Sequence, residues 1–440
     1  MKESRYNFFF QVDKEHFVFN ALTCALANID DSFKENMKRA INGEEINTKL
    51  LHDMKKTGVL IEDCFDELDC LRFRRMQVKF QERTLGIIIA PTMMCNFACP
   101  YCYERPQSTF MKDEVMDAIV EKVKDAAERK MPIKITWFGG EPLLAKDIIW
   151  KLSKRMVDIC QENGVDYKAT MISNGYLVDD NVIENMIAYK ISRVQVTVDG
   201  TPDIHNVRRK LKNSNEPTFD KIMTNIKKMS DAGIKVLIRV NVDKTNIERV
   251  NELIPELKKY EFKNCYVYLG KVTDSTDVTE HIADTCLDMS EYSHESDNWT
   301  RVLMENAVMA DAKPMYPSPK DCFCTADCLS MFAVDPNGNM YKCLHDVGNL
   351  SKKVGNIVDT KDNIEPQKQQ EQFSVFSNYM LWSPFHFPEC KECKVLPLCM
   401  GGCPSSGIRA SMPICVPLKY NLIDSLKLWV ISKKNINERR

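Results

Sequence analysis

The chain has 440 residues, which is enough for about two to four domains. Its hydrophobic content of 44% and charged content of 28% are ordinary for a globular protein. The 60 basic and 62 acidic residues nearly cancel, and we find no apolar run long enough to cross a bilayer. These features argue against a nucleic-acid-binding or membrane protein. Because the first residues do not form a signal peptide, we expect a cytoplasmic protein without nucleic-acid or membrane partners.

Residues 1–83 are expected to form a small separate domain. Two aromatic-rich strands at 6–10 and 17–22, on either side of a turn-like Asp13-Lys14-Glu15, predict a β-hairpin. Helical patterns and one short strand follow, at 32–42, 48–57, 59–61 and 66–80. This combination predicts a winged-helix-like domain.

Residues 84–285 show a regular alternation of apolar strands and amphipathic helices. The expected strands are 85–90, 133–138, 167–172, 194–198, 236–242 and 265–269. The expected helices are 112–129, 146–162, 181–189, 219–231 and 246–259. Such alternation predicts a parallel sheet with right-handed crossovers, here an α/β fold with an incomplete, TIM-like (β/α)6 barrel.

The last third of the chain has a different character. Residues 286–320 are expected to be a linker with some helix around 298–311. Residues 421–440 are expected to form a C-terminal helix and tail, and the helical pattern itself starts near 418. Between them, 321–420 has little periodicity and many Cys, Pro and Gly residues. We expect bound metal, rather than an apolar core, to hold this segment together. The 18 cysteines of a chain without an export signal are better explained as metal ligands than as disulfides.

Three cysteines lie close together after the first strand of the alternating region, at Cys95, Cys99 and Cys102. A four-iron, four-sulfur cluster normally takes four Cys ligands, so three would leave one iron open. An open coordination position is typical of a catalytic metal, and the end of a strand is where barrel active sites lie. A zinc knuckle and unliganded core thiols are the alternative interpretations.

The spacing CxxxCxxC, with Tyr101 before the last cysteine, resembles the radical S-adenosylmethionine (radical SAM) superfamily. The resemblance implies that the open iron chelates the methionine end of SAM, and that one electron cleaves SAM to a 5′-deoxyadenosyl radical. The expected cofactors are therefore SAM and a [4Fe–4S] cluster, supplied with electrons by a donor such as flavodoxin or ferredoxin.

Glycine-rich and polar motifs follow the later strands in order, as a SAM site requires. The sequence Gly139-Gly140-Glu141 resembles the GGE motif of the superfamily, in which glycines allow close backbone approach and a carboxylate meets the SAM ammonium. The resemblance implies further SAM contacts at Ser173, Asn174, Asp199, Arg209, Arg239 and Leu269. Ser173 and Asn174 suit the ribose and Arg209 the SAM carboxylate, with Arg208 as a neighbour of the site. Each motif alone is a common turn, and their order behind the cysteines carries the prediction.

Seven cysteines of the C-terminal third match the pattern of the SPASM domain, which accompanies radical SAM enzymes that modify peptides and proteins. The resemblance implies two auxiliary [4Fe–4S] clusters, three clusters in all. Two full sites need an eighth ligand, and Cys322 lies just upstream of the seven. The first would use Cys322, Cys328, Cys343 and Cys403, and the second Cys390, Cys393, Cys399 and Cys415. Cys324 could replace Cys322, which the spacing favours. Zinc is the alternative metal, since CxxC pairs alone would suit it.

Together these resemblances predict a maturase of ribosomally synthesised peptides. The N-terminal domain would capture the leader of a precursor peptide as an added strand. The radical would install a thioether or carbon–carbon cross-link, and the auxiliary clusters could take up the remaining electron. The sequence identifies no catalytic proton acceptor.

Three other functions compete with this one. An anaerobic sulfatase-maturating enzyme, which forms formylglycine, shares the barrel and the SPASM cysteines, but an Asp follows the cysteine at the position where Leu344 follows Cys343. Peptide epimerisation is a further alternative. An iron–sulfur scaffold without SAM turnover would leave the GGE and ribose-site residues without a purpose.

Overall fold

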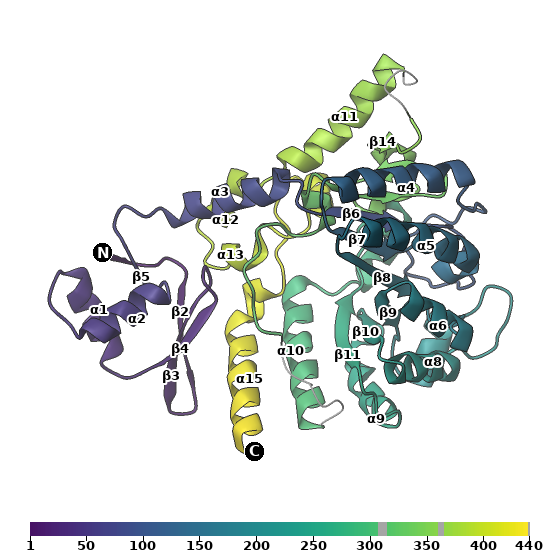
Figure 1. Ribbon diagram of the computed structural model, residues 1–440. Helices are drawn as coiled ribbons and strands as arrows, with labels where there is room; N and C mark the ends of the chain where they lie inside the picture. The colour runs from purple at the N-terminus through teal and green to yellow at the C-terminus, as the bar shows by residue number, and fades with distance from the viewer. Residues whose placement is uncertain (307–314, 360–364, 439–440) are drawn as a thin grey trace.

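A computed structural model describes residues 1–306, 315–359 and 365–438 of the chain. Its described residues form one nine-stranded sheet, in the order β11-β10-β9-β8-β7-β6-β12-β13-β14, a three-stranded sheet, β2-β3-β4, and the two-stranded pair β1-β5. The large sheet fills one side of the molecule, and the three-stranded sheet lies at the opposite end (Figure 1).

The expected alternation of strands and helices is confirmed. Neighbouring strands from β6 to β11 are parallel, with bounds β6 Leu85–Ile89, β7 Ile133–Trp137, β8 Tyr167–Ser173, β9 Ile191–Thr197, β10 Lys235–Val242 and β11 Cys265–Lys271. The helices of this region are α4 Asp113–Glu128, α5 Lys146–Glu162, α6 Asp180–Ala188, α7 Pro202–Arg208, α8 Phe219–Asp231 and α9 Leu253–Lys258. The fifth expected helix, 246–259, is a 3-10 turn, η2 Ile247–Glu252, followed by α9.

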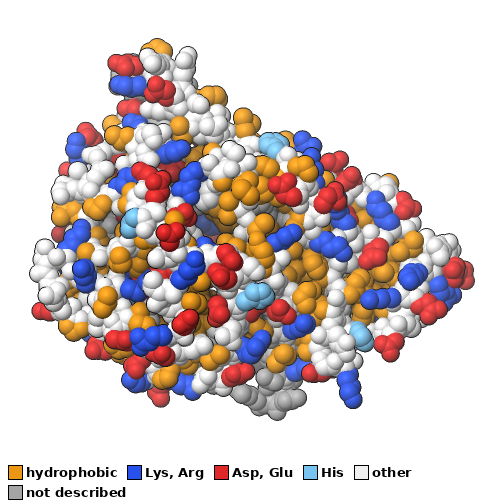
Figure 2. Space-filling view, turned by 180° about the vertical axis from the view of Figure 1, so that it is seen from behind, with side chains coloured by type: hydrophobic (Ala, Val, Ile, Leu, Met, Phe, Trp, Pro, Cys, Tyr) orange, Lys and Arg blue, Asp and Glu red, His pale blue; other side chains and the backbone are white. Residues whose placement is uncertain are grey.

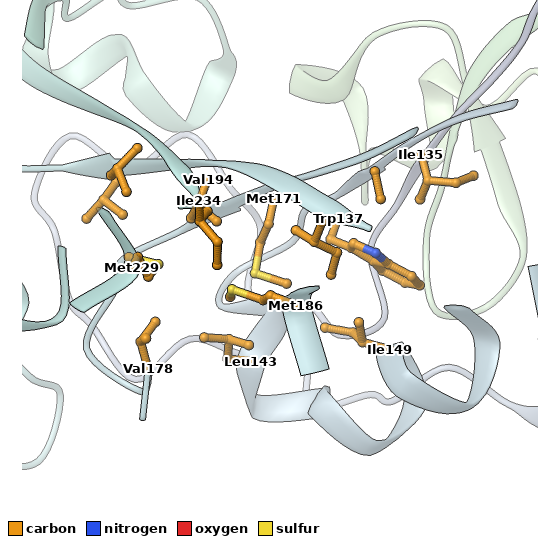
Figure 3. Close-up of a cluster of buried hydrophobic side chains, with 14 of the residues drawn as sticks. Ile135, Trp137, Leu143, Ile149, Met171, Val178, Met186, Val194, Met229 and Ile234 are labelled. Carbon is orange, nitrogen blue, oxygen red and sulfur yellow. The ribbon is translucent and has the colours of Figure 1, made fainter. Parts of the chain in front are cut away.

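Burial on the helix-facing side of the sheet explains why these apolar runs form strands. Trp137 of β7 and Met171 of β8 are buried and point toward Ile149 of α5 and Met186 of α6 (Figure 3). Burial of such side chains is the main favourable contribution to folding. Because the strands are parallel, their carboxyl ends, and the loops that carry the sequence motifs, lie at one edge of the sheet.

The sheet continues into the Cys-rich segment, which the sequence did not predict. Strand β12 (Met331–Val334) pairs in parallel with β6, and β13 (Asn339–Tyr341) and β14 (Gly355–Asn356) follow in antiparallel order. These strands are too short to show a periodicity, and β12 is fixed by its pairing with a strand far away in the sequence. The segment also contains α11 Pro366–Leu381, α12 Pro388–Lys391, α13 Leu396–Cys399 and α14 Pro404–Ala410.

The N-terminal region contains the predicted hairpin and short strand, and two strands that the sequence did not predict. Strands β2 (Asn7–Val12), β3 (Glu15–Asn20) and β4 (Ala25–Ile29) form an antiparallel sheet, while β1 (Lys2–Glu3) pairs with β5 (Leu60–Ile61). The helices are α1 Phe33–Ile41, α2 Thr48–Lys56 and α3 Glu67–Phe80. One face of the sheet packs on α1 and α2, and the other packs on α15 and the last cysteine-rich loops. The winged-helix assignment itself stays a prediction.

Residues 286–305 differ from the expected linker. They contain helix α10 (Met289–Glu305), whose Trp299 and Leu303 are buried one turn apart. This helix packs against β11 and against α15 (Leu418–Glu438), which lies beside it in Figure 1. The last part of the expected helix, 307–311, lies outside the described residues, as do 360–364 of the Cys-rich segment and 439–440 of the tail.

No helix in the described part of the chain is long and apolar enough to span a membrane. Acidic and basic side chains are intermingled over the face shown in Figure 2, in keeping with the formal net charge of −2.

Helix α15 ties the N-terminal sheet to the rest of the molecule, and we expect Leu426→Ala to destabilise that junction. Leu426 is fully buried in a cluster with Phe10 and Phe19, so truncation should cost about 2–5 kcal/mol of unfolding free energy. Chemical denaturation of both variants measures the effect. Ile431→Ala on the same helix, where the side chain is 38% exposed, is the control and should cost less than about 1 kcal/mol. Equal losses would contradict the packing described.

Candidate functional site

The loop that carries Cys95, Cys99 and Cys102 begins at the carboxyl end of β6. Two backbone hydrogen bonds to the segment after α7 hold it: Ala98 N–H donates to the Lys210 carbonyl, and Lys212 N–H donates to the Asn96 carbonyl, both 2.9 Å. Within the loop, Cys102 N–H donates to the Cys99 carbonyl at 3.2 Å. The strand end and the α7 segment thus present the three thiols together on one loop.

Gly139 and Gly140 allow the GGE loop to touch the cysteine loop. A Cβ atom on Gly139 would lie 2.2 Å from the Thr92 carbonyl oxygen, and one on Gly140 would lie 2.4 Å from the Met94 carbonyl oxygen. Gly139 also has a φ of +115°, which side-chain-bearing residues rarely adopt. The next residue, Glu141, donates its N–H to the Met94 carbonyl at 2.8 Å. The close approach expected of these glycines is therefore made to protein backbone.

The carboxylate of Glu141 joins the GGE loop to the loop after β8. It is fully buried and accepts hydrogen bonds from Leu143 N–H (3.0 Å), the Ser173 hydroxyl (2.9 Å) and Asn174 N–H (2.7 Å). Burial raises the pKa of Glu141, and these donors act in the opposite direction. The Asn174 side-chain amide donates to Asn96 Oδ1 in the cysteine loop at 2.8 Å. The structure thus brings Glu141, Ser173 and Asn174 together, as predicted, beside the cysteine loop.

Asp199 and Arg209 meet at Tyr101, between the second and third cysteines. The Tyr101 hydroxyl donates to Asp199 Oδ2 and accepts from Arg209 Nη1 at 2.8 Å. Arg208 pairs with Asp243 at 2.8 Å, and its Nε lies 3.5 Å from Asp199 Oδ2, so it borders the cluster as the sequence led us to expect. Asp199 and Arg209 therefore lie together in space beside the loop that carries Cys99, and do not merely follow it in the sequence.

Buried polar atoms without partners show that this cluster fits a bound group. Asp199 Oδ1 and Arg209 Nε are buried and find no hydrogen-bond partner among the described residues. Such orphaned atoms are costly unless a ligand satisfies them. Burial also raises the pKa values of Cys95 and Cys102 to about 12, so that bare thiolates are disfavoured there. A cationic cluster core would stabilise the thiolates, since thiols deprotonate on binding metal.

The last two predicted contacts lie further along the sheet edge. Arg239 Nε donates to Asn241 Oδ1 at 2.7 Å, and Gly270 leaves the space that the Arg239 side chain fills. Leu269 is buried, and its carbonyl oxygen accepts a hydrogen bond from the Tyr292 hydroxyl at 2.6 Å. Both residues lie on the expected strands, and their contact with SAM stays a prediction.

A cavity of about 270 Å³ lies between the barrel loops and the Cys-rich segment. Arg105, three residues after Cys102, lines one side, together with the 275–280 loop after β11. The other side comes from the loop after Cys343, from α11 and from α14, the helix that follows Cys403. Tyr103 and His345 stack across the same boundary with ring centroids 4.1 Å apart. The cavity is therefore lined by residues that closely follow Cys102, Cys343 and Cys403 in the chain.

The four cysteines expected to hold the second auxiliary cluster line one cavity. Its volume is about 120 Å³, and Cys390, Cys393, Cys399 and Cys415 all contribute to its wall. The Lys419 ammonium lies 3.4 Å from Cys393 Sγ at its edge. Within the described ranges, no three His, Cys, Asp or Glu side chains are placed to hold a single metal ion. The predicted set is thus brought together around a space that fits a cluster.

The cysteines of the first auxiliary set are also gathered. Cys322 and Cys328 are neighbours, since Cys328 raises the pKa of the Cys322 thiol and Cys322 lowers the pKa of the Cys328 thiol. Burial raises the pKa of Cys324 to about 12, and Cys403 and Cys328 add to this effect as neighbours. Cys403 and Cys324 act in the same way on Cys343. Since Cys322 and Cys324 both lie beside Cys328, the choice between them stays open.

Several residues of the site escaped the sequence analysis. Tyr101 was noted as part of a spacing, yet it joins Asp199 to Arg209. Arg105 pairs with Asp277, and the Tyr379 hydroxyl donates to Asp346 Oδ2 at 2.5 Å, both pairs in the wall of the larger cavity. The position of Tyr101 inside the cysteine motif was a usable signal, whereas Asp277 and Tyr379 lie in segments without a motif.

Comparison with known families identifies one domain of the chain. Residues 89–257 match the Radical SAM superfamily. The chain contains a radical SAM domain. It is therefore an enzyme with radical SAM chemistry, and the domain implies SAM and a [4Fe–4S] cluster as cofactors. The cysteine loop, the GGE loop and the carboxyl ends of β8, β9 and β10 lie within the matched residues, and β11 lies beyond them.

Three proteins show the extent of the similarity. The cysteine-type anaerobic sulfatase-maturating enzyme of Clostridium perfringens (strain 13 / Type A) is 25% identical over 351 residues, covering 72% of this chain and 88% of that protein. The solved structure of native anSMEcpe with bound AdoMet has a TM-score of 0.60 at 21% identity and covers 80% of this chain and 100% of its own. Streptococcus suis SuiB bound to the precursor peptide SuiA has a TM-score of 0.54 at 14% identity and covers 94% and 98%. The two structures establish a shared fold.

Because Gly140 touches backbone that cannot move aside, Gly140→Ala should displace the cysteine loop. We expect a loss of about 1–3 kcal/mol of stability from overpacking and of about four irons per chain after anaerobic reconstitution. Thermal unfolding and iron analysis measure the two effects. Gly355→Ala is the matched control, since its new Cβ would meet only the flexible end of Met340. Normal iron content in Gly140→Ala would show that this contact does not support the loop.

Proposed function

We propose that this radical SAM enzyme installs a cross-link, either a thioether or a carbon–carbon bond, in a ribosomally synthesised precursor peptide. The observation that carries the proposal is the cavity of about 270 Å³ between the loop after β11 and the Cys-rich segment. Its wall includes residues two or three positions after Cys102, Cys343 and Cys403, so a peptide bound there would lie near both the SAM cluster and the proposed first auxiliary cluster. Its walls supply charged and polar groups on both sides, which suit a peptide backbone.

In this proposal Cys95, Cys99 and Cys102 hold the cluster that binds SAM. Bound SAM supplies the 5′-deoxyadenosyl radical that removes a hydrogen atom from an unactivated carbon. Asp199 and Arg209 would satisfy their orphaned atoms on the bound group, with Arg209 at the SAM carboxylate. Glu141, Ser173 and Asn174 would position the ammonium and ribose ends, with Gly139, Gly140, Arg239 and Leu269 shaping the remaining wall. The protein thereby binds and orients, while the cofactor carries the difficult step.

The two auxiliary sites would each hold a [4Fe–4S] cluster, which with the SAM-binding cluster makes three clusters in the chain. The four-cysteine cavity supports the second site. The thiols around Cys328 support the first site, with Cys322 as the ligand that the spacing favours. The first electron would come from a donor such as flavodoxin or ferredoxin.

The N-terminal domain, residues 1–83, would bind the leader of the precursor peptide. Among the described residues, β2 and β4 are the edges of the three-stranded sheet and have no further partner strand. An open edge can accept a peptide as an added strand. The structure of SuiB bound to its precursor peptide covers 94% of this chain. So little is left uncovered that most of residues 1–83 must lie within the matched part.

Formylglycine formation, as in anaerobic sulfatase maturation, is the second candidate. The similarity to the sulfatase-maturating enzyme over 72% of this chain favours it. Leu344 argues against it, because the sulfatase-maturating family places an Asp directly after the corresponding cysteine. The first acidic residue after Cys343 in the sequence is Asp346, whose carboxylate accepts a hydrogen bond from the Tyr379 hydroxyl.

The test uses the peptide encoded by a short reading frame beside this gene, incubated anaerobically with reconstituted enzyme, SAM and a reductant. We expect the peptide to lose two hydrogens, as seen by high-resolution mass spectrometry, with formation of 5′-deoxyadenosine. A cysteine that no longer alkylates indicates a thioether, and fully free thiols indicate a carbon–carbon link.

Cys99→Ala is the matched control and should form no deoxyadenosine, because the thiolate that completes the first cluster is gone. An aldehyde trapped by a hydrazine reagent would instead establish formylglycine formation. An unchanged mass with deuterium taken up from heavy water would establish epimerisation and contradict the cross-link.

A further inference from the structure

A lysine is buried beside the proposed first auxiliary cluster. Lys342, which precedes Cys343, is only 1% exposed. Its ammonium donates to the carbonyl oxygens of Cys328 and Met331, each at 2.5 Å. The charge is therefore fixed between two residues proposed as ligands, Cys328 and Cys343. Its contacts are two neutral carbonyls, so no carboxylate balances it directly.

Two more cations reach the same region from helix α3. Arg75 and Lys79 are 2% and 3% exposed, and both contact the buried carboxylate of Asp327, at 2.8 and 3.2 Å. Asp327 directly precedes Cys328. Lys79 also donates to the carbonyl oxygens of Tyr379 and Trp382, each at 3.0 Å.

The buried charges do not balance without a bound anion. Three cationic side chains (Arg75, Lys79 and Lys342) surround one carboxylate, Asp327, which leaves two positive charges uncompensated. Two other nearby acids have cations of their own: Asp321 pairs with Arg74 at 2.9 Å, and Asp346 lies among Lys352, Arg105 and Arg409. Burying unpaired charge is expensive. A [4Fe–4S] core with four thiolates carries a net charge of −2 when oxidised and −3 when reduced, which matches this surplus.

We infer that Lys342, together with Lys79, tunes the first auxiliary cluster to accept an electron. Buried positive charge favours the reduced, more negative form of a cluster and raises its reduction potential. The inference rests on the proposed function and adds the residues that favour electron uptake by this cluster. Both lysines are positioning residues, since they act through the cluster.

The electron count of the proposed reaction requires such an acceptor. Closing a thioether or carbon–carbon bond removes two hydrogen atoms from the peptide. One leaves as a hydrogen atom and converts the deoxyadenosyl radical to 5′-deoxyadenosine. The other leaves as a proton to solvent and one electron, and the oxidised first auxiliary cluster is the one-electron oxidant for it.

The test is a redox titration of the full chain followed by electron paramagnetic resonance, without any peptide. Cys95, Cys99 and Cys102 are replaced by Ala so that only auxiliary clusters contribute. We expect Lys342→Met to lower the reduced-to-oxidised ratio of one cluster at least tenfold at a fixed potential, or about 59 mV for one electron. Lys342→Arg, which keeps the charge, should restore the ratio.

Lys419→Met is the matched control, since Lys419 lies 3.4 Å from Cys393 Sγ and should shift only the other cluster. If Lys342→Met loses iron, Lys79→Met carries the same test. An unshifted ratio in a cluster-loaded Lys342→Met or Lys79→Met variant overturns the inference while leaving the proposed function intact. The absence of any auxiliary signal in the parent protein overturns both.

Discussion

The site depends on two places where backbone meets backbone with no room for a side chain. Gly139 lies against Thr92, and Gly140 lies against Met94, so the GGE loop supports the segment that leads into the cysteine loop. The parallel strands bring these loops to one edge, and the Glu141 carboxylate then joins both to the loop after β8 through Ser173 and Asn174. Rigid support of this kind is what an oxidant as reactive as a carbon radical requires, because the substrate must be held close to one atom and away from others.

The cysteine-rich segment is packed onto the large sheet. Strand β12 extends this sheet beside β6, and a small apolar cluster packs Ile88 and Phe138 against Tyr341 and Val347. The N-terminal region is joined from two sides, by α15 along its sheet and by α3, whose Arg75 and Lys79 reach Asp327. In our proposal, helix α3 therefore contacts both the region that binds the leader and the region that holds the first auxiliary cluster.

Much of this arrangement was predictable from sequence because local patterns determine it. Strands β6 to β11 are apolar runs set between amphipathic helices, and the motif residues follow them at fixed offsets. The rest depends on contacts between distant residues. Strand β12 has four residues and is defined by β6, and the buried pair of Arg75 and Asp327 joins positions 252 apart. Helix α10 was partly missed because Trp299 and Leu303 are its few buried apolar residues in a polar stretch. Charge pairing at the cavity, such as Arg105 with Asp277, has no sequence signal at all.

The central claim is that this chain carries three four-iron clusters, of which only the one at Cys95, Cys99 and Cys102 is open to SAM. Mössbauer spectroscopy of protein reconstituted with ⁵⁷Fe, recorded with and without SAM, tests it most directly. The account predicts about twelve irons per chain by the four-iron stoichiometry, and a change on adding SAM confined to one iron of one cluster. About four irons per chain, or tetrahedral zinc in the C-terminal cysteines, would contradict it.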